Sequence, residues 1–154
     1  MAGELHKEVI EALYREALVL ADDARSVFDL REGAAARASD DAMRIAMSIE
    51  GLRTTTRVMH VLAWLLNQRA LQAGEMSEAQ ALRSGRLADS NASDPMQLQL
   101  LELETRALIR ETERLYDRVA RLDAEWRAAE DREAPVRAMQ GRIAEAFGTG
   151  NTGG

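Results

Sequence analysis

Residues 94–126 read DPMQLQLLELETRALIRETERLYDRVARLDAEW, and this stretch decides the fold class. Asp94 supplies a helix-capping carboxylate, Pro95 suits the first helical position, and Gln97 completes a capping box. Apolar and threonine side chains then recur at alternating spacings of three and four residues. They are Leu98, Leu101, Thr105, Leu108, Thr112, Leu115, Val119, Leu122 and Trp126. This spacing predicts one long helix that ends between residues 127 and 134 and packs along a single seam.

Two amphipathic segments precede this stretch. Within residues 4–31, apolar side chains recur at spacings of four and three, which places them on one face of a helix. The series comprises Leu5, Val9, Leu13, Ala17, Leu20, Ala24 and Val27. Residues 39–74 form a second predicted helix, with Ser39 as its expected N-terminal cap. The predicted core stripe of that helix comprises Ile45, Ile49, Leu52, Thr56, Met59, Ala63 and Leu66.

The second helix carries a further apolar stripe beside the first. This stripe consists of Val58, Val61, Leu62 and Leu65. The C-terminal half of the helix is therefore apolar nearly all round, and such a helix is covered on more than one side. Trp64 lies in this stretch and fits two interpretations, a surface anchor for a partner protein or a core residue covered by the other long helices. The residue pattern leaves both open.

Together these elements predict an all-α, antiparallel three-helix bundle in up-down-up order. The long helices are similar in length and the first connection between them is short, which suits that order. A capping box at Ser77–Gln80 adds a short extra helix between the second and third long helices, at about residues 78–88. We expect residues 1–133 to form the bundle domain.

The C-terminal residues 134–154 are a predicted flexible tail. Pro135 interrupts the helical pattern, and the last residues are mostly glycine, threonine and asparagine, which cannot hold a core. Apolar residues within 136–147 are spaced for a short helix that would form when the tail docks.

The composition excludes several classes of protein. The chain has no cysteine, which rules out disulfides and thiolate metal sites. Its formal net charge of −6 provides no overall basic surface for nucleic acid. The longest apolar run, Val58–Leu66, is far shorter than the roughly 20 residues that span a bilayer. We therefore expect a cytoplasmic protein without a membrane partner.

The sequence shows no catalytic constellation. It contains no Gly-rich phosphate loop and no His-Glu-x-x-His motif, and neither His6 nor His60 has a zinc-spaced partner on its own helix. The Glu-x-x-His pairs that hold iron in four-helix bundles are also missing. We expect a non-enzymatic protein that binds no metal and no cofactor.

A row of arginines on the third long helix offers an alternative function. It comprises Arg106, Arg110, Arg114, Arg118 and Arg121. Such a row would suit a nucleic-acid-associated regulator. Acidic residues alternate with the arginines and no base-stacking aromatic accompanies them, so nucleic acid is the less favoured partner.

Residues 49–77 read IEGLRTTTRVMHVLAWLLNQRALQAGEMS. This stretch resembles the signature of the regulator of CtrA degradation family. That signature runs Leu-Thr-Thr-Arg-Leu-Met, then Trp-Leu-Leu-x-Gln-Arg-Ala, then Gly-Glu-Met-Thr/Ser. Weaker matches occur at 13–17 and 121–123, and the resemblance covers most of residues 9–126.

The resemblance implies a three-helix, usually dimeric, cytoplasmic protein of alphaproteobacteria. The namesake of that family is an adaptor for the ClpXP protease and performs no chemistry itself. The implied partners are ClpX, a response-regulator-type adaptor, a cyclic-di-GMP-binding adaptor, and cell-cycle regulators as substrate proteins. The matched positions proposed to bind partners are Arg53, Arg57, Trp64, Gln68, Arg69, Glu75 and Met76.

Overall fold

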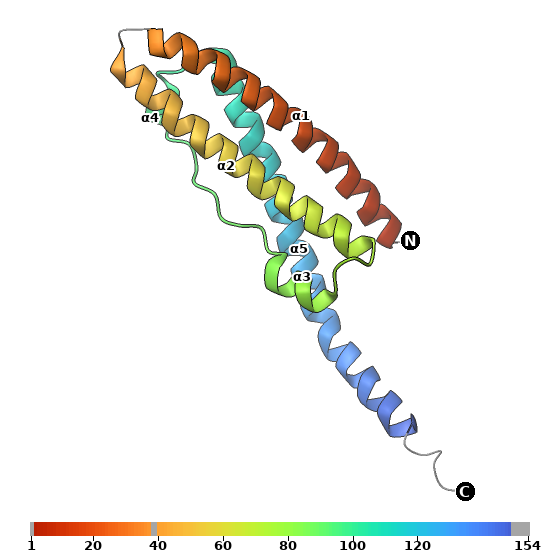
Figure 1. Cartoon of the computed structure of the whole chain (residues 1–154). Helices are drawn as coiled ribbons and strands as arrows, with labels where there is room; N and C mark the ends of the chain where they lie inside the picture. The colour runs from red at the N-terminus through yellow and green to blue at the C-terminus, as the bar shows by residue number, and fades with distance from the viewer. Residues whose placement is uncertain (1, 38–39, 149–154) are drawn as a thin grey trace, which may run out of the picture. The chain divides into compact units, whose positions relative to one another are not determined.

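A computed structural model describes residues 2–37 and 40–148 of the chain. The described part is all-α and has no strand, which confirms the predicted fold class. Its helices are α1 (Ala2–Arg37), α2 (Asp41–Gln72), α3 (Glu78–Ser84), α4 (Pro95–Leu98) and α5 (Leu103–Gly148) (Figure 1). The chain divides into two units, Met1–Val119 and Ala120–Gly154. The predicted domain boundary after residue 133 and the flexibility of the tail stay predictions.

Helices α1 and α2 pack against each other as an antiparallel pair. The side chain of Asp40 caps α2 by accepting hydrogen bonds from the backbone N–H groups of Ala42 and Met43. Asp40 is therefore the N-terminal cap of α2. Ser39, the predicted cap, lies outside the described residues. The short extra helix is confirmed as α3, and its predicted capping box between Ser77 and Gln80 is present.

The core of α1 is close to the predicted face but differs from it at several positions, and the predicted Val9 and Val27 are half-buried. Leu13, Ala17, Leu20 and Ala24 are buried as predicted. Ile10 and Phe28 are buried as well, whereas Leu5 is 62% exposed. The buried face is therefore rotated slightly from the predicted one, because the helix is covered by α2 along one side and by α5 along another.

The predicted core stripe of α2 is wrong. Ile45, Leu52, Met59 and Leu66 all face solvent, and the opposite side of the helix forms the core. The residues buried on α2 are Ala46, Met47, Glu50, Gly51, Thr54, Arg57, Val58, Val61, Trp64 and Leu65. The core side of α2 thus contains polar groups, whereas the outer side is apolar, so hydrophobicity alone selected the wrong face.

The connection between α3 and α4 reverses the predicted direction of the last long helix. Residues 85–94, the strap, run back along α2 (Figure 1). Arg57 donates to the Asn91 carbonyl oxygen over 3.0 Å, and the Asp94 N–H donates to Glu50 Oε1 over 3.1 Å. As a result the chain enters α5 near the start of α2. Within residues 103–119, α5 runs antiparallel to α1 and in the same direction as α2, so the up-down-up order is wrong.

The predicted third helix is in fact two helices. After α4, the N–H groups of Leu100 and Leu101 donate to carbonyls three residues back, and this turn precedes α5. The turn buries both Leu98 and Leu101. The predicted end between 127 and 134 is also wrong, because α5 continues through Pro135 to Gly148. Residues 136–147 are helical as part of α5 and not as a separate short helix.

Gly51 marks the close approach of α2 to α1. A Cβ at this position would lie 3.0 Å from Cδ1 of Phe28. We expect Gly51→Ala to lower the free energy of unfolding by about 1 kcal/mol, because overpacking costs more than the gain in helix propensity. Urea unfolding followed by circular dichroism measures this. Gly141→Ala is the control, since its Cβ would meet no atom within 4 Å, and it should raise helix content. A stabilised Gly51→Ala protein would contradict the expected close contact.

Candidate protein-binding surface

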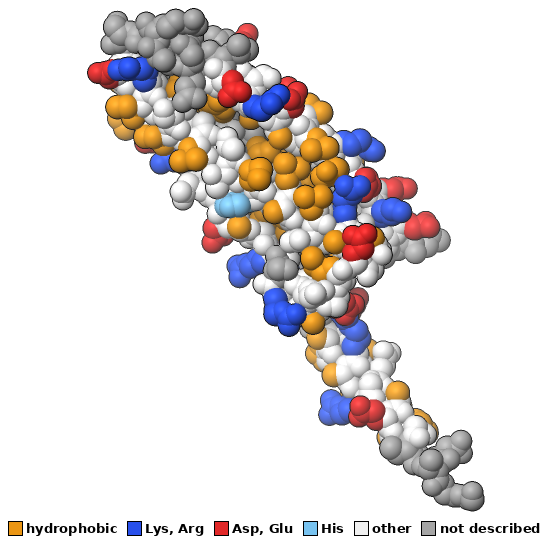
Figure 2. Space-filling model, viewed as in Figure 1, with side chains coloured by type: hydrophobic (Ala, Val, Ile, Leu, Met, Phe, Trp, Pro, Cys, Tyr) orange, Lys and Arg blue, Asp and Glu red, His pale blue; other side chains and the backbone are white. Residues whose placement is uncertain are grey.

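The solvent side of α2 carries a row of large apolar side chains, which we call the outer stripe. It consists of Ile45, Leu52, Met59 and Leu66, which are 57%, 70%, 59% and 48% exposed. These residues are seven positions apart, so they lie in one line along the helix. Figure 2 shows hydrophobic side chains gathered on this face, over α2 and the adjoining part of α1. Exposed apolar rows of this kind commonly mark protein interfaces.

The outer stripe is also free of charge. The exposed residues between 45 and 66 are Ile45, Ser48, Leu52, Thr55, Thr56, Met59, Ala63 and Leu66. The three charged residues of this stretch point elsewhere: Glu50 and Arg57 are buried, and Arg53 is half-buried in an ion pair with Glu50. In a chain with 30% charged residues, an uncharged exposed face of this length suits burial against another surface.

Two of the predicted partner-binding residues lie inside the protein. Trp64 is 2% exposed and belongs to the core. Arg57 is also 2% exposed, and its guanidinium donates to Thr112 Oγ1, the Asn91 carbonyl and Ser93 Oγ. These contacts join α2 to α5 and to the strap. Of the two interpretations of Trp64, the structure therefore supports the core residue, and neither side chain offers a surface contact in this conformation.

Burial lowers the pKa of the Arg57 guanidinium, and the carboxylates of Glu113, Glu50 and Asp117 act in the opposite direction. The charge is retained at neutral pH, because an arginine pKa begins far above it. Arg57 therefore acts as a buried cation that holds three segments together.

Arg53 is tied to its surroundings in the same way. It donates to Glu50 Oε1 over 2.8 Å and reaches Gln97 Oε1 at 3.5 Å, so it connects α2 to α4. His60 lies nearby on α2, with its Nδ1 2.7 Å from Ser90 Oγ of the strap. His60 therefore contacts the strap, whereas Arg53 joins α2 to α4.

The other predicted residues lie at the C-terminal end of α2. Arg69 donates to Glu11 Oε1 over 2.8 Å and stacks on Tyr14, with 4.4 Å between the guanidinium carbon and the ring centre. Arg69 and the exposed Glu75 line a groove of about 380 Å³, which we call the end groove. The rest of its lining consists of Lys7, Glu11, Leu66, Ala70, Gln72 and Ala73. Gln68 and Met76 are half-buried and do not line it.

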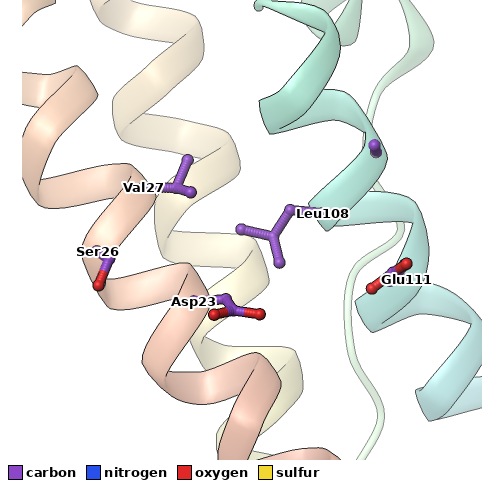
Figure 3. A pocket seen from close by; sticks show the side chains of 6 residues that line it. Asp23, Ser26, Val27, Leu108 and Glu111 are labelled. Atoms are coloured by element: carbon purple, nitrogen blue, oxygen red, sulfur yellow. The ribbon is translucent and has the colours of Figure 1, made fainter.

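A second hollow of about 280 Å³ lies between α1 and α5. Val27 and Leu108 point into the space between the helices, with Asp23 and Glu111 near its edge (Figure 3). Ser26 and Ala107 complete the lining. The lining contains no histidine, lysine or arginine.

The described residues hold no cluster of three histidine, aspartate or glutamate side chains that would bind a metal ion. No helix in the described part of the chain is long and apolar enough to cross a membrane. The arginine row on α5 is uneven: Arg118 pairs with Glu16 of α1 and Arg106 is half-buried, whereas Arg110, Arg114 and Arg121 are exposed. The five arginines therefore do not form one continuous exposed basic surface that could bind an anion.

The sequence profile of a family described as "Protein of unknown function (DUF1465)" matches residues 2–147. The chain belongs to the DUF1465 family. Comparison with curated proteins and with solved structures gives no match. The family description neither names an activity nor confirms the resemblance to the regulator of CtrA degradation family.

Sequence reasoning missed the solvent exposure of the outer stripe in this DUF1465 protein. Its residues were identified as an apolar series, but they were assigned to the core. One available signal was the composition of the other face, where Glu50, Thr54 and Arg57 accompany Val58, Val61 and Leu65. Polar residues on both faces of α2 mean that hydrophobicity alone does not select the buried face.

Proposed function

We propose that this DUF1465 protein is a non-enzymatic cytoplasmic adaptor that works as a homodimer and helps deliver cell-cycle regulators to the ClpXP protease. The observation that carries the proposal is the uncharged outer stripe on the solvent side of α2. A long exposed helix face without charge favours binding to another protein over chemistry on a small molecule.

Two further features support the adaptor function. Residues 49–77, which resemble the regulator of CtrA degradation signature, form most of α2 and the turn that follows it. The end of that stretch places Arg69 and Glu75 in the end groove, where both charged side chains border the apolar Leu66. A groove lined by both charged and apolar side chains suits a peptide or loop of a partner protein.

The mechanism that we propose is proximity. One surface of the adaptor would bind the protease together with its response-regulator-type adaptor, and another would bind the substrate protein. Holding both at once raises the effective concentration of substrate at the protease without a catalytic step in the adaptor.

The test is retention of ClpX on the immobilised protein in the presence of the response-regulator-type adaptor. We expect wild-type protein to retain ClpX and Glu75→Arg to reduce retention at least about tenfold, because it reverses a charge at the edge of the groove. Glu130→Arg, an exposed position on α5, is the matched control and should bind as wild type does. Retention no higher than with an unrelated helical bundle would refute the adaptor proposal.

A further inference from the structure

We infer that the outer stripe of α2 is the dimer surface, and that two copies pair there in antiparallel orientation about a twofold axis between positions 57 and 58. The inference deepens the proposed function, since it rests on the homodimer proposed there and specifies its surface and register. The occupant of the stripe is therefore a second copy of this chain.

The first argument is the alternation of large and small side chains along the stripe. Between the large residues lie the small, solvent-facing Thr56 and Ala63 and the half-buried Ala70. In an antiparallel pair centred on the stated axis, three of the four large residues of one copy face a small residue of the other, and Leu66 faces the half-buried Ile49. The facing pairs are Ile45 with Ala70, Leu52 with Ala63, and Met59 with Thr56, and each occurs twice by symmetry.

A parallel pairing in register fits poorly by the same criterion. It would place Leu52 against Leu52 and Met59 against Met59, with Thr56 facing Thr56 between them. Large layers would hold the helices apart, and the small layers would then leave voids. The side-chain sizes on this face therefore select the antiparallel arrangement.

The second argument is electrostatic. Because the exposed positions from 45 to 66 are uncharged, this stretch meets its copy without like charges in opposition, and Arg69, beside Ala70 at the end of the footprint, is paired with Glu11. Arg57, which lies beside the axis in sequence, is turned into the core and bonded there. The same uncharged stretch is present on a second copy. Two such stretches are therefore electrostatically compatible with each other.

The third argument is size. From Ile45 to Ala70 the helix rises about 38 Å at 1.5 Å per residue, and a helix is about 10 Å wide. The footprint is therefore roughly 400 Å² per copy, about half of the usual 800 Å² per partner in a stable complex. Half-buried Leu62 and the adjoining apolar part of α1 widen the contact (Figure 2). These dimensions favour a reversible dimer.

Cysteine cross-linking tests the register directly, because the chain has no cysteine of its own. We expect a mixture of Leu52→Cys and Ala63→Cys full-length proteins to form a disulfide-linked dimer under mild oxidation. Neither variant should cross-link with itself. In the proposed pair, residue 52 of one copy and residue 52 of the other lie about 16 Å apart along the helices, and so do the two residues 63. This separation exceeds the roughly 7 Å limit for a disulfide. Cross-linking of Leu52→Cys with itself would overturn the antiparallel register.

Light scattering tests the surface. Met59→Glu brings two carboxylates together near the axis, so we expect the wild-type dimer to become a monomer with at least about a hundredfold weaker association. Met96→Glu, the same change at an exposed methionine of α4, should remain dimeric. Unchanged circular dichroism establishes that both variants fold. If the Met59→Glu protein remains a dimer, the inference is overturned and the proposed function is left intact. If the wild-type protein is a monomer, the homodimer is removed from both the inference and the proposed function.

Discussion

Trp64→Ala should lower the free energy of unfolding by about 3–5 kcal/mol, the usual cost of removing a buried aromatic side chain. Trp64 is 2% exposed and is among the largest fully buried side chains of the described residues. Since domains of this size are stable by about 5–15 kcal/mol, the variant should be only marginally folded at 37 °C. Urea unfolding followed by circular dichroism is the measurement, since loss of the tryptophan alters the fluorescence signal itself.

The control for this prediction is Leu103→Ala at an exposed position on α5, which should change stability by less than about 0.5 kcal/mol. All proteins are compared at one concentration, because dimer formation adds stability that depends on concentration. A Trp64→Ala protein as stable as wild type, with altered dimerisation alone, would instead favour the interpretation of Trp64 as a surface anchor.

Much of the fold was predictable from local signals in the sequence. The seam of α5 through Leu108, Leu115 and Val119 is buried as its heptad spacing predicted. The capping signals at Ser77 and Asp94 also start helices where expected. These features succeed because one helix or one turn of it determines them, and no distant partner is needed.

The direction of α5 depends on contacts that a sequence pattern does not reveal. Polar groups help to hold the strap, including His60 with Ser90 and the backbone of Asp94 with Glu50, beside the buried Leu87. Hydrophobic periodicity carries no information about such bonds, and a connection of this length permits either direction for the next helix. The predicted up-down-up order was therefore a choice between two allowed topologies.

The candidate site was predictable as a set of residues but not as a surface. Both long faces of α2 carry enough apolar residues to be a core, and the packing of α1, α5 and the strap against one of them decides which one is buried. Arg57 and Trp64 were selected as partner contacts because they belong to an unusual motif. In the structure the same residues hold the protein together, and the exposed apolar residues of α2, among them Leu52 and Met59, lie on the opposite side. A motif of unusual residues thus identifies an important helix without assigning its faces.

Arg57 was predicted to bind a partner protein. In the structure it is instead the main polar contact of the strap. It bonds to Thr112 of α5 and to Asn91 and Ser93 of the strap, while the Thr112 hydroxyl donates in turn to the Ile109 carbonyl. Removing a buried hydrogen-bonded charge leaves its partners unsatisfied, and this costs more than the net value of the bonds.

We therefore expect Arg57→Met, which keeps similar volume without the charge, to lower the free energy of unfolding by about 3 kcal/mol. Protection of the backbone amides of the strap against hydrogen exchange should fall at least tenfold more than that of the buried part of α1, because the strap loses its attachment while the α1–α2 contact remains. Arg110→Met on the exposed side of α5 is the matched control and should change neither quantity. If the Arg57→Met protein has normal stability and normal strap protection but no longer binds its partner, the structural role of Arg57 is contradicted. That result would favour the interpretation of Arg57 as a surface contact.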